Sequence, residues 1–155
     1  MNAAQIHLLS NHIPLALPFI GILILLISIF IKSDIAKRIG YLILVLGGLF
    51  TIPTFLSGEG AEEIVEQIGR SHDLIHEHEE LAETFAYLNY LLALLAAFAL
   101  WFNWKKAHWE KYLFMIVLTL SIIVAGFALC TGESGGEISH PEIHSKKIER
   151  LITFR

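Results

Sequence analysis

The sequence is poor in the residues that mark soluble, disulfide-linked and nucleic-acid-binding proteins. Charged residues make up 17% of the 155-residue chain, against about 25% in a typical soluble domain. A single cysteine, Cys130, excludes an internal disulfide and a zinc site built from several cysteines. Eleven Lys and Arg against fifteen Asp and Glu give a net charge of −4, so the chain lacks the basic surface that binds phosphates. We therefore expect no nucleic-acid partner.

Apolar residues are abundant instead, at 55% of the chain, and they form four long runs in which Glu83 is the one charged residue. Each run has about 18–23 residues, and a helix rising about 1.5 Å per residue would then cross a hydrocarbon core of about 30 Å. The sequence predicts an all-α integral membrane protein, a four-helix bundle built from two helical hairpins. The spans are expected at residues 14–31, 39–57, 81–103 and 112–130.

The loops predict how the bundle lies in the membrane. Residues 32–38 and 104–111 each hold three Lys or Arg, whereas residues 58–80 hold only Arg70. Short loops rich in Lys and Arg stay in the cytoplasm, so both termini and the middle loop are predicted on the periplasmic or outer side.

Two shorter segments are also expected to contact the bilayer. The first is residues 59–70, predicted to make a short helix on the membrane surface. It belongs to the membrane domain, which is predicted to span residues 1–142. Residues 143–155 form a basic amphipathic tail, for which anionic lipid is the simplest partner.

Imidazoles and carboxylates are concentrated on the predicted outer side, which holds seven of the eight histidines and thirteen of the fifteen acids. The second and fourth runs end in similar motifs, one at Ser57-Gly58-Glu59 and the other at Thr131-Gly132-Glu133. This similarity indicates two related hairpins. A helix C-terminus carries about −0.5 charge, so acids gathered there favour a bound cation.

Histidine and carboxylate side chains together suit iron, copper or zinc, and two histidines from different helices suit haem iron. Helix bundles build such sites from inward-facing side chains. His12 and His76 are the preferred ligands, with Glu59 and Glu133 as ligands or proton acceptors. The candidate cofactor-binding residues are His7, His12, His76 and His140. The candidate metal ligands are His12, Glu59, His76, Glu79, Glu83, Glu133 and Glu137.

Several of these motifs occur together in a known pattern. His7 and His12 precede the first run, which begins at Pro14, Leu88-Asn89 lies in the third, and T-G-E-S-G-G-E follows the fourth. Over about residues 5–142 the chain resembles a bacterial membrane family catalogued as domain of unknown function number 2231. The resemblance implies a four-span fold in the bacterial inner membrane. Some members are fused to cytochrome c-like or Rieske-like domains, which implies redox work by association.

Three functions follow from these features. The leading hypothesis is a small membrane redox subunit that holds haem b or a transition-metal ion near its outer face and exchanges electrons with a partner protein. The first alternative is an ion or metal transporter with a Glu/His entry site, which with four spans would need a homo-oligomer. The second alternative is a scaffold subunit without a cofactor. The sequence assigns no catalytic residue.

Overall fold

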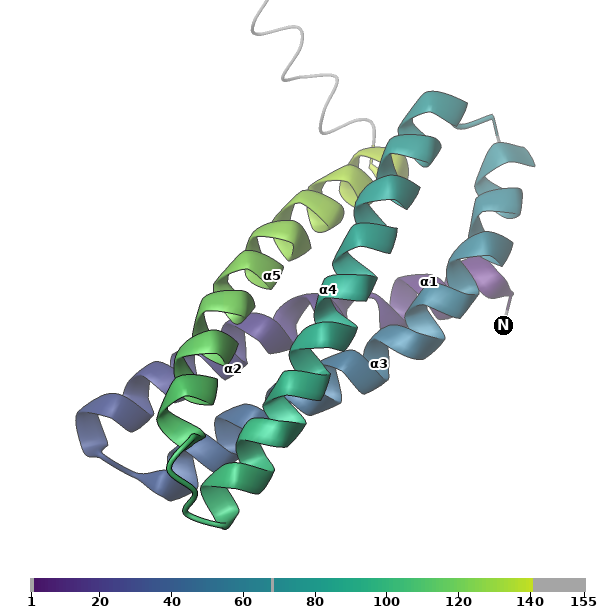
Figure 1. Ribbon diagram of the computed structural model, residues 1–155. Coiled ribbons are helices and arrows are strands. Elements are labelled where there is room, and N and C mark those ends of the chain that lie inside the picture. The colour runs from purple at the N-terminus through teal and green to yellow at the C-terminus, as the bar shows by residue number, and fades with distance from the viewer. Residues whose placement is uncertain (1, 68, 141–155) are drawn as a thin grey trace, which may run out of the picture.

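The chain folds into a bundle of long helices, which confirms the predicted all-α architecture (Figure 1). The computed structural model describes residues 2–67 and 69–140, so the predicted tail at 143–155 lies outside the described residues. The α1–α2 pair and each of the other three helices are long and apolar enough to cross a membrane. The helices of the described chain are α1 (Ala3–Ser10), α2 (His12–Ile31), α3 (Asp34–Gln67), α4 (His72–Trp104) and α5 (Glu110–Ser139).

The helices extend beyond the predicted spans. The prediction of a separate surface helix over residues 59–70 is wrong, because α3 continues without a break to Gln67. Ala61 is buried on this extension, so packing continues past the apolar run. Pro53 lies inside α3, and α3 changes direction in its second half (Figure 1), as helices often do at proline.

Helix α4 begins at His72, well before the predicted span, and Ser71 has the extended backbone of an N-cap residue. At the start of α2, Asn11 has helical backbone angles and makes no side-chain cap. Residues before it form the separate helix α1, which starts with a capping box between Asn2 and Gln5. This short helix packs on α3.

The first helix of each hairpin buries the same positions. All five buried residues of α2 have a buried counterpart in α4 exactly 71 positions later. The buried residues of α2 are Pro14, Pro18, Gly21, Leu25 and Ser28, and their counterparts are Phe85, Asn89, Leu92, Ala96 and Ala99.

The second helix of each hairpin repeats in the same way. Seven of the eight buried residues of α3 have a buried counterpart in α5, here 77 positions later. This offset corrects the alignment expected from sequence: Thr54, not Ser57, corresponds to Thr131. The shared motif is therefore T-x-x-S-G, at residues 54–58 and 131–135. The two hairpins are structural repeats that run in the same direction.

The repeat gives the bundle two distinct ends. At one end α2 and α4 begin and α3 and α5 finish, and we call this the histidine end because it holds His7 and His78. The opposite end carries Lys32, Lys37 and Lys111, and we call it the lysine end. Between the ends, large apolar side chains such as Phe30 cover the outside of the bundle, as expected of helices that face lipid.

Candidate functional site

His7 is held against the end of α3. Its Nδ1 lies 3.1 Å from the carbonyl oxygen of Thr54 and 3.4 Å from Oγ of Ser57. A carbonyl oxygen only accepts hydrogen bonds, so Nδ1 carries the proton and donates. In the neutral ring, Nε2 then keeps its lone pair. The separate helix α1 makes this contact because it packs on α3, so the ring of His7 is half-buried rather than in solvent.

His78 makes the equivalent contact between α4 and α5. Its Nδ1 lies 2.8 Å from Oγ of Ser134, and that hydroxyl donates to the carbonyl of Thr131 at 3.0 Å. Since the hydroxyl proton is used, Oγ accepts from Nδ1, and Nε2 of the neutral ring again keeps its lone pair. The ring lies directly over Gly135, where a Cβ would come within 3.0 Å of Cε1 of His78. Glycine at this position makes room for the imidazole.

Each half of the repeat therefore contributes one imidazole, fixed by a T-x-x-S-G motif. Gly58 lies beside His7 as Gly135 lies beside His78, although the first contact is looser, with a Cβ at 3.8 Å from Cε1 of His7. Neither Nε2 atom has a hydrogen-bond partner among the residues that the structure describes. The arrangement offers two oriented nitrogen lone pairs at one end of a membrane bundle.

Most of the site residues predicted from sequence lie on the exposed surface, unlike the partly buried rings of His7 and His78. His12 is exposed at the start of α2, and His76 faces outward, with 64% of its side chain exposed. His76 contacts Glu79 at 3.8 Å and Glu80 at 3.6 Å, both on its own helix. Among residues 2–67 and 69–140, the structure brings together no group of three or more His, Cys, Asp or Glu that could hold a metal ion. Glu59, Glu83, Glu133 and His140 are exposed, and Glu137 is partly buried.

The periodicity of α4 explains why His78 was missed. His76, Glu80 and Glu83 form a stripe at spacings of three and four, and each of them is exposed, so the stripe lies on the outer face. His78 is two positions from His76 and so lies on the opposite side of the helix. It is in phase with the buried residues Phe85 and Asn89, seven and eleven positions later. Extending the phase of the buried face back along α4 would have identified it.

The histidine end and both hairpins fall within one family match. Residues 3–143 match the model of the family described as "Predicted membrane protein (DUF2231)". The chain belongs to this family. No curated protein and no solved structure matches the chain. This DUF2231 protein is thus a membrane protein in contact with the lipid bilayer, and it has four candidate spans.

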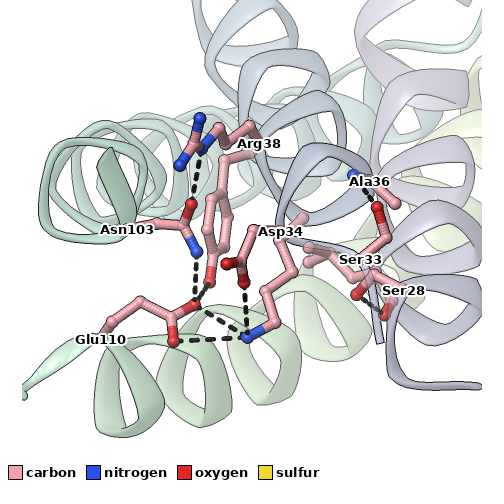
Figure 2. A network of polar contacts seen from close by, with 10 residues as sticks. Ser28, Ser33, Asp34, Ala36, Arg38, Asn103 and Glu110 are labelled. Atoms are coloured by element: carbon pink, nitrogen blue, oxygen red, sulfur yellow. Dashed lines mark hydrogen bonds and ion pairs between the residues drawn. The ribbon is translucent and has the colours of Figure 1, made fainter. Parts of the chain in front are cut away.

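A second polar cluster of this DUF2231 protein lies at the lysine end, and sequence reasoning did not predict it (Figure 2). Only 14% of the Glu110 side chain is exposed. Its carboxylate accepts from Nζ of Lys37 at 3.3 Å, the hydroxyl of Tyr41 at 3.2 Å and Nδ2 of Asn103 at 3.1 Å. Nε of Arg38 donates to Oδ1 of Asn103 at 2.7 Å. These bonds join α3, α4 and α5 and satisfy the buried carboxylate, so the cluster is a structural contact.

Proposed function

We propose that this DUF2231 protein is a small membrane redox subunit that binds haem b through His7 and His78. The observation that carries the proposal is the matched setting of the two imidazoles. Each ring donates from Nδ1 to an oxygen of a T-x-x-S-G motif and keeps Nε2 for a ligand, which is the orientation that metal-bound histidines adopt. The proposal replaces His12 and His76 by two histidines that face the bundle.

The number of ligands favours haem over a single metal ion. Structural zinc takes four protein ligands and catalytic zinc takes three, whereas the described chain offers no group of three or more ligating side chains. Haem iron needs only two axial donors from the protein, because the porphyrin supplies the other four nitrogens. Two equivalent imidazoles, one from each hairpin, match that requirement.

The chain's own groups define the rest of the role. Thr54 and Ser134 hold the proton on each Nδ1, which fixes the tautomer and raises the basicity of Nε2. Haem held by His7 and His78 would supply one-electron transfer. The lysine-rich loops at the opposite end favour a cytoplasmic lysine end, and the site would then exchange electrons with a partner protein on the outer side of a bacterial inner membrane.

The test is a spectrum of the purified protein and of four single variants. We expect a Soret band, sharp visible bands on reduction, and about one haem b per chain with two axial ligands. His7→Ala and His78→Ala should each lose the six-coordinate spectrum, and added imidazole should restore it. His12→Ala and His76→Ala are the matched controls, since both remove an exposed histidine from the same end, and both should keep the spectrum.

The possible results separate the two sets of ligands. A colourless protein from haem-replete cells would reject haem binding. Loss of the spectrum in His12→Ala or His76→Ala, with His7→Ala and His78→Ala unaffected, would reject the proposed ligands in favour of the exposed pair. A redox titration of the coloured protein should give a single one-electron transition.

A further inference from the structure

The interface between α2 and α5 is more open than its counterpart in the repeat. The repeat relates α2 to α4 and α3 to α5, so the α2–α5 interface corresponds to the α3–α4 interface. In the latter, Gly48 lies so close to α4 that a Cβ would collide with the Cβ of Ala93. The corresponding residues on the other side are Ala125 and Ile22, which are bulkier. In keeping with this, α2 and α5 share the least extensive contact of the four neighbouring pairs of long helices in the described chain.

At the lysine end this open interface contains a cavity of about 380 Å³. Its walls combine apolar and cationic side chains. Ile29 comes from the last turn of α2, and Phe114 and Met115 come from the start of α5. Lys32, Lys37 and Lys111 also line it. A cavity lined by both cationic and apolar side chains, between two helices that can cross a membrane, matches the two chemical halves of a phospholipid.

Only one of the three lysines that line the cavity has acidic partners in the described chain. Lys37 is committed to Glu110 at 3.3 Å and to Asp34, which also lines the cavity, at 3.8 Å. Lys32 and Lys111 have no acidic partner among the residues that the structure describes. Lys111 has its ammonium over the ring of Tyr112, at 4.9 Å from the centroid, which leaves its charge without an acidic neighbour. The two lysines therefore favour a ligand with negative charge.

We propose that the α2–α5 cavity binds an anionic phospholipid, with its phosphate held by Lys32 and Lys111 and an acyl chain against Phe114 and Met115. Basic pockets between membrane helices take anionic headgroups in this way, because lysine near the surface attracts negative charge and apolar walls cover the chain. A zwitterionic lipid has the same acyl chains but no net charge, so the preference for anionic lipid rests on the two lysines.

The experiment compares lipid retention by the whole protein in detergent, measured by native mass spectrometry. Phosphatidylglycerol, phosphatidylcholine and inorganic phosphate are added separately. We expect phosphatidylglycerol to bind with a preference that falls about fivefold for each lysine removed. The test variant is Lys32→Asn with Lys111→Gln. Asn is chosen because Lys32 has a φ of 48°, which asparagine tolerates.

The chain provides a matched control at the same end of the bundle. Lys106 also has a positive φ, of 52°, and neither Lys106 nor Lys105 lines the cavity. Lys106→Asn with Lys105→Gln therefore removes the same charge and should keep the preference. A third variant, Lys32→Arg with Lys111→Arg, should also keep it, which guards against misfolding as the cause of a loss.

Three results would overturn the proposal. The first is equal retention of phosphatidylglycerol and phosphatidylcholine by the unmodified protein. The second is a preference that survives in the test variant or is lost equally in the control. The third is binding of inorganic phosphate that displaces phosphatidylglycerol and is as tight, which would mark an anion site without a lipid.

Discussion

The close approach of α3 and α4 at Gly48 makes a prediction whose size can be worked out from the structure. In Gly48→Ala, the new Cβ collides with Ala93 and lies 3.3 Å from the carbonyl oxygen of Asn89. Both contacts are to the backbone or the Cβ of α4, so no flexible side chain can move aside. Overpacking of this kind costs about 1–3 kcal/mol, while replacing a helical glycine by alanine gains roughly 0.5–1 kcal/mol. We therefore expect a net loss of up to about 2.5 kcal/mol in the free energy of unfolding, and a loss of about 1–3 kcal/mol relative to a glycine-to-alanine change that meets no neighbour.

The measurement is reversible unfolding in mixed micelles, with Gly126→Ala as the control. Gly126 is also inside a long helix, but a Cβ there meets nothing within 4 Å, so this variant should be as stable as the parent or slightly more stable. Gly48→Ala combined with Ala93→Gly should recover most of the loss, because the deleted methyl leaves space for the added one. A coupling free energy of about 1–3 kcal/mol between the two positions would identify their contact as the cause. Equal stability of Gly48→Ala and Gly126→Ala would refute the reasoning.

Three other predictions concern the two ends of the bundle. Gly135→Ala should displace His78 and weaken haem retention by about 10–100-fold, as loss of an oriented ligand does. Gly58→Ala is the control: its Cβ would lie 3.8 Å from His7, so the visible spectrum should be unchanged. Glu110→Ala should lower the free energy of unfolding by about 3 kcal/mol, because Lys37 and Asn103 lose their shared acceptor. Lys105 lies outside the network, so Lys105→Ala should leave the free energy of unfolding unchanged. The orientation can be tested with a membrane-impermeant maleimide in a Cys130→Ser background. The reagent should label Glu63→Cys in intact cells but Lys106→Cys only after lysis, and the reverse pattern would contradict the expected orientation.

The sequence predicted the features that depend on composition and failed on those that depend on helix phase. Four apolar runs were enough to predict four helices, because a bilayer requires each run to form a helix of that length. The ends of α3 could not be predicted, since Gly58 and Gly60 suggest a stop, while the packing of Ala61 continues the helix to Gln67. Propensity at a helix end is weak compared with tertiary packing.

The sequence places the candidate site at the histidine end but selects mostly exposed side chains there, whereas the proposed ligands His7 and His78 are partly buried. Counting histidines and acids identifies a polar rim without saying which residues face inward. His76 draws attention because it shares a helix face with Glu80 and Glu83, but that face is exposed, and His76 contacts Glu79 and Glu80 of its own helix there. The inward residues follow from matching the two hairpins, but the similar motifs after the second and fourth runs suggest pairing Ser57 with Thr131. That alignment is three positions away from the one that pairs the buried residues, so it obscured the common T-x-x-S-G motif.

The repeat also suggests why the two ends of the bundle should differ in function. At the histidine end each half places an imidazole against a T-x-x-S-G motif, so the symmetry suits a ligand that takes two nitrogen donors. At the lysine end the symmetry is broken. Glu110 joins α5 to α3 and α4 but not to α2, which leaves α2 the least constrained helix there. The cavity lies along that helix, where a flexible lipid chain can fill space that the repeat does not close.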